Sequence, residues 1–354
     1  MNESIRQALN HILDGQTVPR PATEAAFAAI MDGECGEVDI AALLTALTVR
    51  GEEVEEIAGA AAVMRQRATR IECQSNGLLD TCGTGGDRLH TFNISTATAF
   101  VAAAAGVPVA KHGNRSVSSS SGSADVLEAL GLNLQLSPEQ VGTCIDEVGI
   151  GFCFAPLLHS AMKNVVPVRK ALGIRTIFNL LGPLTNPAGA QFQLLGANRK
   201  HFAEKLATAL FELGCDRALV VCGNDELDEV SLWGNTAVFD VSREGVVERA
   251  WSASDFGLDE CNVSELVVNG AAESADRIRR IFDGETGPSR DIVVANAAAS
   301  LVAAGKVDGP GEAATLAAEA VASGRAKDVL ERLSAATNAM SPSERETEGR
   351  RTNQ

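Results

Sequence analysis

A regular alternation of short apolar strands and helices, which begins near residue 76, constrains the fold of this chain more than any other feature. Alternation of this kind predicts an α/β fold, a mostly parallel sheet flanked by helices on both faces. The expected elements are strands that begin at Leu78 and Val107 and lie at about 150–155, 192–196 and 217–222, and a helix at 199–213. A sheet of this class binds its ligands at the carboxyl ends of its strands.

Helical patterns precede and interrupt this alternation. Residues 1–70 are expected to form helices, one of which ends at Gly51, and the segment 157–187 is a helix-rich insertion that would pack with them. A cleft would then separate this helical part from the α/β part. The predicted organisation is a small N-terminal helical domain of residues 1–70, joined by helices from about 157–187; an α/β domain of 71–156 and 188–342; and a disordered tail of 343–354.

The net charge limits the possible partners. A formal net charge of -16 repels nucleic acid, phosphate and anionic membranes at long range, so neither nucleic acid nor a membrane is an expected partner. An anionic substrate would need local cations, backbone amides or a metal ion. The eight cysteines match no zinc spacing, no run approaches the ~20 apolar residues of a membrane helix, and the first residues show no secretion signal. These features predict a soluble, cytoplasmic protein with reduced cysteines.

A glycine-rich loop follows the first expected strand. Its sequence is Asp80-Thr81-Cys82-Gly83-Thr84-Gly85-Gly86-Asp87, and Thr91-Phe92-Asn93-Ile94-Ser95-Thr96 leads into a helix. Glycines let the backbone approach an anion closely, and the helix N-terminus adds free amides and a positive dipole end. Arg88 excludes the dinucleotide fingerprint, and no Gly-Lys-Ser/Thr of a P-loop follows. An ordinary helix-capping turn is the alternative, but the attached Asp87 and hydroxyls favour a phosphate or pyrophosphate cradle.

A second polar loop follows the next strand. It runs Lys111-His112-Gly113-Asn114-Arg115-Ser116-Val117-Ser118-Ser119-Ser120-Ser121-Gly122-Ser123, and Ser123 is expected to cap a helix that ends at Gly131. Two cations and many small hydroxyls suit a second phosphate group, although a solvated serine loop is the alternative. Because both loops follow successive strands of one sheet, they should converge on one crevice.

Acidic and basic residues elsewhere fit the same crevice. Asp228 and Glu229 lie just beyond the 217–222 strand, where both carboxylates can converge on Mg²⁺, which prefers oxygen ligands together with substrate phosphates. A solvated acidic turn is the alternative. Arg169 lies beside Lys163, Lys170 and Arg175 in a local basic patch, and its guanidinium would suit a carboxylate. The alternative is that this segment is a surface helix with scattered charges.

The two loops resemble the signature motifs of the anthranilate phosphoribosyltransferase family, and the similarity extends over essentially the whole chain. The first loop with Asn-Ile-Ser-Thr is highly specific to that family, whereas pyrimidine nucleoside phosphorylases carry a relative of the second. Further matching segments are Phe154-Ala155-Pro156, His159, Ala161-Met162-Lys163, Pro167-Val168-Arg169, the run from Leu172 to Asn179, Asp225, Leu227-Asp228-Glu229, Ser231, Gly287-Pro288 and Asn296-Ala297-Ala298-Ala299.

The resemblance implies transfer of the phosphoribosyl group of phosphoribosyl pyrophosphate (PRPP) to the amine of anthranilate, in tryptophan biosynthesis. It implies a homodimer assembled through helices, with PRPP in the cleft and Mg²⁺ as cofactor, two ions per subunit. The implied PRPP-binding residues are Gly83, Gly86, Asp87, Thr91, Asn93, Ile94, Ser95, Thr96, Lys111, Ser119 and Ser123. The implied anthranilate-binding residues are Gly83, His112, Asn114 and Arg169, with Arg169 facing the carboxylate; His112 has a structural hydrogen bond as its alternative role. The implied metal ligands are Ser95, Asp228 and Glu229, and the implied catalytic residues are Lys111, Asp87 and Asn93.

Three positions depart from the family pattern. Ser120 stands in place of a usual lysine, Glu226 in place of a common glycine beside the metal carboxylates, and Ser160 in place of a usual proline. These departures would affect substrate affinity or the range of amines accepted. Two rival readings are a pyrimidine nucleoside phosphorylase, which the first loop does not fit, and a non-catalytic relative that binds nucleic acid, which the negative charge and the retained Asp228 and Glu229 oppose.

Overall fold

The structure is a computed structural model that describes residues 1–115 and 122–340. Ser119, Ser120 and the predicted disordered tail of 343–354 lie outside the described residues. Every cysteine is described and free; Cys144, Cys153 and Cys222 are buried, and the other five are partly buried. In the described part of the chain, no helix combines the length and apolarity that a membrane crossing requires.

A seven-stranded sheet forms the centre of the larger part of the molecule, with strand order β3-β2-β1-β4-β5-β6-β7. Its strands are β1 (Leu79–Gly83), β2 (Val109–Gly113), β3 (Ile150–Phe154), β4 (Phe192–Gly196), β5 (Arg217–Gly223), β6 (Thr236–Ser242) and β7 (Gly245–Trp251). The first five are parallel to one another, β6 pairs with β5 in antiparallel orientation, and β7 pairs with β6 in antiparallel orientation. The prediction of a mostly parallel sheet is confirmed; the β6–β7 hairpin was not predicted.

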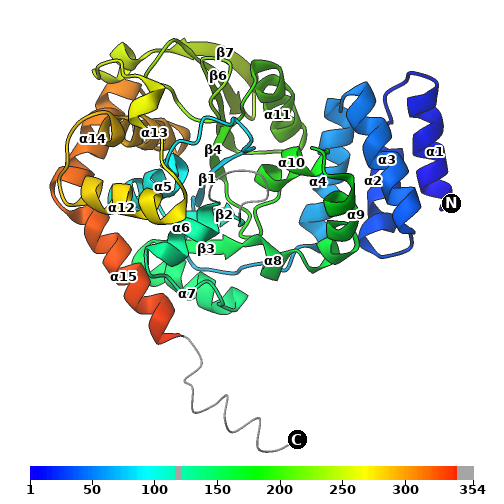
Figure 1. Cartoon of the computed structure of the whole chain (residues 1–354), viewed down its shortest axis with the longest axis horizontal. Helices are drawn as coiled ribbons and strands as arrows, with labels where there is room; N and C mark the ends of the chain where they lie inside the picture. The colour runs from blue at the N-terminus through cyan, green and yellow to red at the C-terminus, as the bar shows by residue number, and fades with distance from the viewer. Residues whose placement is uncertain (116–121, 341–354) are drawn as a thin grey trace, which may run out of the picture.

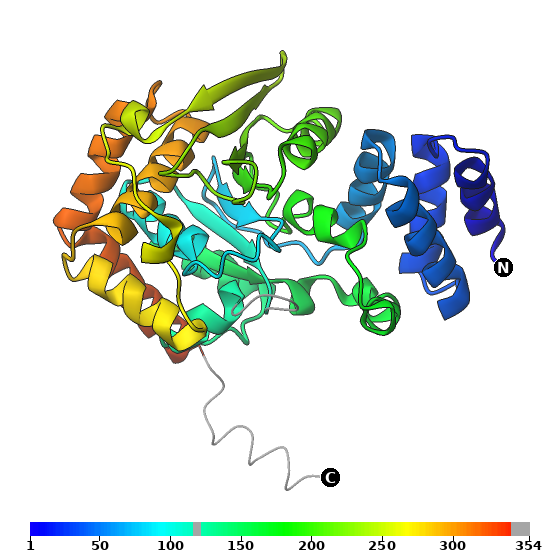
Figure 2. The same cartoon turned by 45° about the horizontal axis from the view of Figure 1, so that its top comes forward.

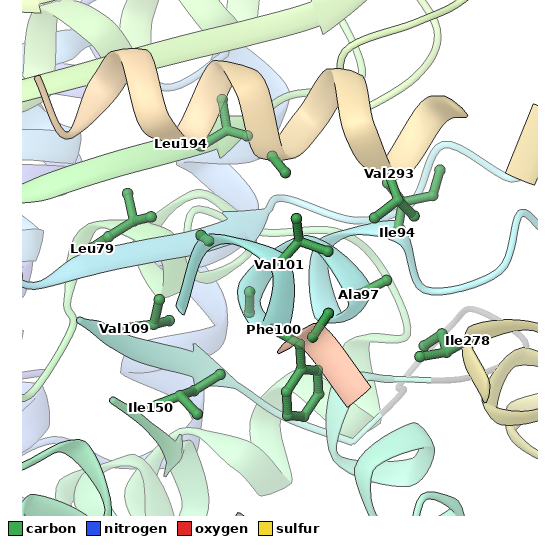
Figure 3. Close-up of a cluster of buried hydrophobic side chains, with 14 of the residues drawn as sticks. Leu79, Ile94, Ala97, Phe100, Val101, Val109, Ile150, Leu194, Ile278 and Val293 are labelled. Carbon is green, nitrogen blue, oxygen red and sulfur yellow. The ribbon is translucent and has the colours of Figure 1, made fainter. Parts of the chain in front are cut away.

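Helices cover both faces of the sheet, as predicted (Figure 1). One face carries α5 (Ile94–Ala104), α12 (Ala271–Phe282), α13 (Pro288–Ala303), α14 (Pro310–Ala322) and α15 (Arg325–Ala339), and the other carries α11 (Lys200–Glu212). Strand β5 shows why both faces need cover: Leu219 and Val221 enter one core, whereas Val220 and its alternate neighbours enter the other. Alternation of side chains along a strand produces this division. Figure 3 shows Phe100 and Val101 of α5 against Leu79, Val109 and Ile150 of the sheet.

The N-terminal helices form a separate bundle beside the α/β part (Figures 1 and 2). Its helices are α1 (Glu3–Leu13), α2 (Arg20–Met31), α3 (Glu37–Arg50) and α4 (Val54–Arg67). The inserted segment contains α8 (Ala155–Leu158), a 3-10 turn (Ser160–Asn164), α9 (Val166–Leu172), α10 (Phe178–Leu181) and a second 3-10 turn (Gly182–Leu184). Buried Val168 and Phe178 of this segment share a core with Phe27 and Leu44 of the bundle. A helical domain and an α/β domain are therefore present.

Helix caps agree with the sequence prediction at Gly51 but not at Ser123. Gly51 ends α3 with a φ of 91°, as predicted, and Ser137 with Gln140 forms a capping box at the start of α7 (Pro138–Val148). The prediction that Ser123 caps a helix is wrong: Gly122 is the N-cap of α6 (Ser123–Ala129), and Ser123 is its first helical residue. The Asp125 carboxylate accepts the Gly122 N–H and thereby supplies the cap from inside the helix.

Candidate active site

Three chain segments meet above the carboxyl ends of the parallel strands. The glycine-rich loop leaves β1, the second loop leaves β2, and the segment 224–231 leaves β5. Four of the five parallel strands end in glycine, at Gly83, Gly113, Gly196 and Gly223. These termini form the floor of the site, in agreement with the position expected for a parallel sheet.

The segment that carries Asp228 lies almost in contact with this floor. A Cβ atom added to Gly196 would lie 1.6 Å from the Asp228 carbonyl oxygen, and one added to Gly83 would lie 2.3 Å from Asp228 Oδ2. Only glycine permits so close an approach. Gly85 N–H in turn donates to Asp228 Oδ2 at 2.6 Å. The sequence signal for this packing is the glycine that ends four of the five parallel strands, which was not used in the prediction.

The N-terminus of α5 faces the same floor. Asn93 is its N-cap, and the Asn93 side chain accepts the Thr96 N–H at 3.1 Å and the Ser95 hydroxyl at 3.3 Å. Thr91 and Ser95 are partly exposed. Ile94 and Thr96 are buried, and the Thr96 hydroxyl has no hydrogen-bond partner in the described structure. Of the residues predicted here for PRPP, Asn93 and Ser95 have polar groups beside the other site residues, Thr91 forms an isolated bridge with Val267, and Ile94 and Thr96 have buried side chains.

Three acidic side chains gather in the site. Burial is the main cause, and the charge of the Asp87 carboxylate the second, that raises the pKa of Asp228 to about 7. The two carboxyl groups are hydrogen-bonded to each other. Burial also raises the pKa of Asp87, and it raises that of Glu229 well above the ordinary value. The Ser95 backbone N–H donates to Glu229. Such crowding of negative charge in a partly buried position is typical of a functional site that binds cations.

The donor set suits Mg²⁺ bound with a substrate. No group of three or more His, Cys, Asp and Glu side chains among the described residues is close enough to enclose a metal by itself. Mg²⁺, however, commonly uses one or two carboxylates and completes its shell with water and substrate phosphate oxygens. Asp228 and Glu229 with the Ser95 hydroxyl match that pattern, and burial, with the neighbouring carboxylates, raises the pKa of both acids.

Lys111 lies beneath the site. Its side chain is 3% exposed, and Nζ donates to the Thr81 carbonyl at 2.5 Å and to the Ser95 hydroxyl at 3.3 Å. Burial lowers its pKa, while the neighbouring charges of Asp80, Cys82 and Glu229 raise it. Lys111 therefore places positive charge under Ser95 and Glu229 and ties β2 to β1.

The second loop contributes less charge than its sequence suggests. Arg115, half exposed, pairs with Glu128 at 2.5 Å and with Asp125 at 3.2 Å on α6, so it is not a free cation. The Asn114 side chain accepts the Arg115 N–H at 2.7 Å, and the Ser123 hydroxyl lies against the Asn114 carbonyl at 3.5 Å. The expectation that both cations of this loop serve a phosphate is therefore corrected for Arg115.

Two histidines form a buried pair beside the second loop. His112 Nε2 lies 3.3 Å from His159 Nε2, and His112 Nδ1 lies 3.2 Å from the Gly182 carbonyl. If His112 donates to Gly182, its Nε2 accepts from His159. Burial lowers the pKa of His112 to about 3 and that of His159 to about 4, so both rings are neutral at neutral pH. The structural hydrogen bond expected as the alternative role of His112 is present.

Arg169 on α9 is a guanidinium without a carboxylate partner among the described residues. Its Nη2 donates to the Asn179 side chain at 3.3 Å, and its guanidinium lies over the Phe178 ring, 5.5 Å from the centroid. The Asn179 oxygen also accepts the Thr176 N–H at 3.0 Å, which fixes the amide. Arg169 is thus held in place and keeps donors for an anion, as carboxylate recognition requires.

Two further residues touch the glycine-rich loop and were not predicted as site residues. Arg175, from the inserted segment, donates to the Gly85 carbonyl at 3.2 Å, and Asn198, just beyond β4, donates to the Gly86 carbonyl at 2.9 Å. Glu226, one of the unusual residues, binds the Trp233 indole N–H and the Asn224 amide, each at 2.9 Å, and these bonds lower its pKa. Position beyond a strand end was a usable signal for Asn198, and Arg175 was noted only as part of the basic patch around Arg169 and of a matching family segment.

Comparison with known proteins places this geometry in context. Two family models match the chain: the helical bundle domain of the glycosyl transferase family over residues 6–68, and the a/b domain of that family over residues 75–327. An anthranilate phosphoribosyltransferase of Geotalea uraniireducens is 48% identical over 348 residues, 94% of this chain and 99% of the relative. That of Geobacter sulfurreducens is 51% identical over 323 residues, 87% of this chain and 92% of the relative.

Solved structures agree with the sequence comparison. The anthranilate phosphoribosyltransferase of Thermus thermophilus superimposes with a TM-score of 0.88 at 44% identity, covering 94% of this chain and 99% of that one. The enzyme of Saccharomyces cerevisiae in complex with PRPP and Mg also gives a TM-score of 0.88, at 27% identity, covering 96% and 99%. A further structure of the yeast enzyme holds 4-fluoroanthranilate, at a TM-score of 0.81 and 27% identity, covering 90% and 93%.

Proposed function

This chain belongs to the anthranilate phosphoribosyltransferase family, and on that premise we propose how its residues divide the work of the reaction. The enzyme transfers the phosphoribosyl group of PRPP to the amine of anthranilate and releases pyrophosphate, a step of tryptophan biosynthesis. The observation that carries the assignment of roles is the set of partly buried carboxylates against the Gly83–Gly86 loop. Carboxylates so placed repel a phosphate unless cations intervene.

We propose that PRPP binds over the floor of strand-terminal glycines. Its pyrophosphate would lie against the Gly83–Gly86 amides and the N-terminus of α5, because backbone N–H groups and the helix dipole favour an anion there. Asn93, Ser95 and Thr91 offer side-chain donors, and Asp87 offers an acceptor for a ribose hydroxyl. Ser123 and the residues around it would receive the remaining phosphate.

We propose that Mg²⁺ binds at Asp228, Glu229 and Ser95 together with PRPP. When bound, Mg²⁺ neutralises the carboxylates and the leaving pyrophosphate, as divalent ions do in phosphate chemistry. Two ions per subunit are proposed because the two carboxylates have different neighbours. Asp228 faces Asp87 and Gly85, whereas Glu229 faces Ser95 and Lys111.

Arg169 is proposed to bind the anthranilate carboxylate, and Asn114 and the neutral His112 would contact the rest of the ring. The amine nitrogen attacks the anomeric carbon as the bond from that carbon to pyrophosphate breaks, and the resulting arylammonium, a strong acid, loses its proton to solvent. The amine is neutral at the start, so the step requires position rather than a strong base. Lys111 and the loop amides stabilise charge that develops on the leaving oxygens.

The rival readings lose their support. A pyrimidine nucleoside phosphorylase shares the second loop, but it is the first loop that meets the acidic segment here. A nucleic-acid-binding relative would need a basic groove, whereas the site concentrates carboxylates. We place the enzyme in the cytoplasm, because its eight free cysteines suit a reducing compartment.

We propose a homodimer that forms through the exposed side of α3. Val38 and Val49 are 78% and 83% exposed and lie eleven positions apart, close to three helical turns, so both project from one side of α3. Partly buried Ala42 and Thr45 lie between them on that side. An exposed apolar stripe of this kind is typical of a helix that packs against another chain.

The decisive experiment follows anthranilate fluorescence with purified protein, PRPP and Mg²⁺. We expect Mg²⁺-dependent loss of fluorescence, no turnover for Asp228→Ala, and a raised KM for anthranilate in Arg169→Ala with a smaller change in KM for PRPP. Asp283→Ala is the matched control, because Asp283 is an exposed carboxylate paired with Lys327 far from the site. Full activity of Asp228→Ala would overturn the metal assignment, and an unchanged anthranilate KM in Arg169→Ala would overturn the carboxylate assignment.

A further inference from the structure

A second cavity lies at the opposite edge of the sheet, where β1, β4 and β5 begin. Its volume is about 420 Å³, and its walls include Arg65, Arg70, Glu72, Leu184, Pro187 and Asp216. Asp216 directly precedes β5, and Gln191, also in the wall, directly precedes β4. This cavity is separate from the candidate active site, which lies at the carboxyl ends of the same strands.

Two guanidinium groups in this cavity lack counter-ions. Arg65 is partly buried; its Nε donates to the Leu184 carbonyl at 2.6 Å, and no ion pair engages it among the described residues. Burial lowers the pKa of Arg65, as expected for a cation removed from water without an anion nearby. Arg70 is exposed and has neither an ion pair nor a side-chain hydrogen bond within the described ranges.

The acidic wall does not balance these cations. Asp216 is already paired with Arg243, at 2.5 Å between Oδ1 and Nη2. Glu72 is the one acidic wall residue without an ion pair in the described part of the chain. With Arg243 counted as the partner of Asp216, three guanidiniums stand against two carboxylates, which leaves an excess of one positive charge. In a chain of net charge -16, such a local excess is a specific feature of the cavity.

We propose that this cavity binds a small oxyanion, either a carboxylate on an apolar group or inorganic phosphate. A guanidinium presents donors in a planar fork that matches carboxylate and phosphate oxygens, and Arg65 keeps such donors free. A partly desolvated cation also gains more from an anion than an exposed one does. Leu184, Pro187 and Ala188 provide the apolar wall that would contact the body of an organic anion.

The bound anion would join the two parts of the molecule. Arg65 belongs to α4 of the helical bundle, Arg70 to the connection from α4 to β1, and Asp216 to the α/β part. The wall from Leu184 to Gln191 is the connection that returns to β4. A ligand held among these segments stabilises the folded chain by mass action, so the melting temperature rises with ligand concentration.

Titration calorimetry of the full chain, with benzoate and with inorganic phosphate as probes, tests the proposal. We expect the binding of at least one probe to weaken about tenfold in Arg65→Gln and at least threefold in Arg70→Gln. Arg243→Gln should weaken it about threefold, because Asp216 would then present an unpaired negative charge at the wall. Arg280→Gln is the matched control, since Arg280 is an exposed arginine of α12 paired with Glu285.

The two probes and one active-site variant separate the outcomes. Benzoate binding that is unchanged in Arg169→Gln but lost in Arg65→Gln identifies a carboxylate site, and phosphate binding with the same pattern identifies a phosphate site. Absence of binding by both probes, or binding unchanged in both Arg65→Gln and Arg70→Gln, overturns the proposal. If Arg65→Gln melts at a lower temperature than wild type, the binding test relies on two other variants. These are Arg70→Gln, at an exposed position, and Arg65→Lys, which keeps the positive charge. None of these binding outcomes depends on whether the enzyme consumes anthranilate.

Discussion

At the scale of single residues, the site depends on how closely the backbone of β1 approaches Asp228. Gly83 has no side chain to separate the strand end from this carboxylate, and Gly85 N–H fixes one of its oxygens. Asp87 approaches the same carboxyl group from the loop. The position and the protonation of Asp228 are therefore set by neighbours that the sequence separates by about 140 residues.

Gly83→Ala should impair the site while sparing the fold. The added Cβ would lie 2.3 Å from Asp228 Oδ2, so the carboxylate must move, and we expect kcat/KM for PRPP to fall by at least tenfold. The side chain can rotate away, so the loss in unfolding free energy should stay near 1 kcal/mol. Steady-state kinetics and urea unfolding measure the two effects. Gly309→Ala, with no atom within 4 Å of the added Cβ, is the control; equal kinetics in both variants would contradict the prediction.

The raised pKa of Asp228 predicts a specific dependence of stability on pH. Asp228 has an ordinary pKa of 3.8 and a folded-state pKa of about 7, so the folded chain holds an extra proton between these values. By linkage, its contribution to stability is complete below pH 4 and is lost as pH rises towards 7. Each pKa unit is worth about 1.4 kcal/mol, so we expect a decrease of at least that size.

Melting curves with EDTA at pH 5 and pH 8 measure this effect, as the difference between wild type and Asp228→Asn. The asparagine cannot titrate, so the variant should lose less stability over that interval. Added Mg²⁺ should stabilise the wild type more at pH 8 than at pH 5, because the ion requires the ionised carboxylate. The same pH dependence in both proteins would show that Asp228 is not the titrating group.

At the scale of elements, the N-terminus of α5 carries both a structural and a binding role. Asn93 satisfies the Thr96 N–H as N-cap, and its backbone N–H donates to the Ser274 hydroxyl at 2.8 Å. The first turn of α5 also supplies Ser95, which contacts Lys111 and Glu229. Stability of the helix and affinity for pyrophosphate therefore share one residue, and substitutions can separate the two.

Asn93→Ala and Asn93→Asp should differ in a diagnostic way. Alanine removes the cap, so we expect a loss of about 1 kcal/mol in unfolding free energy together with a raised KM for PRPP. Aspartate caps a helix as well as asparagine does, so stability should be retained, but its negative charge should raise the KM for PRPP further. Urea unfolding and steady-state kinetics test both. If the aspartate variant bound PRPP as tightly as wild type, Asn93 would not face the pyrophosphate.

The sequence predicted elements better than their contacts. Apolar runs placed β4 and α11 well, since local periodicity determines them. The β6–β7 hairpin was not predicted, because β7 is mostly exposed and its mixed charges conceal the strand pattern. Arg115 was expected to serve a phosphate, yet it pairs with Glu128 one helix away. Such pairings depend on tertiary geometry, which residue spacing does not encode.

At the scale of the whole molecule, one residue links the helical bundle to the glycine-rich loop. Arg175 donates to Gly85 of the glycine-rich loop, while its carbonyl lies 3.4 Å from the Thr48 hydroxyl of α3 in the helical bundle. The family resemblance predicted two domains with a cleft, but not this link, because the link joins residues from three distant segments. It also places α3 between the active site on one side and the exposed stripe of Val38 and Val49 on the other.

That arrangement gives the proposed dimer a direct test. Val49→Glu places a charge at one end of the apolar stripe of α3, and burying an unpaired charge in an interface costs several kcal/mol. We expect wild type to sediment as a dimer and Val49→Glu as a monomer at the same micromolar concentration. Val247→Glu on β7, 53% exposed and outside the helical bundle, should leave the dimer intact. Because Thr48 adjoins the stripe and touches Arg175, the monomer should also show a raised KM for PRPP; a fully active monomer would limit the interface to a structural role.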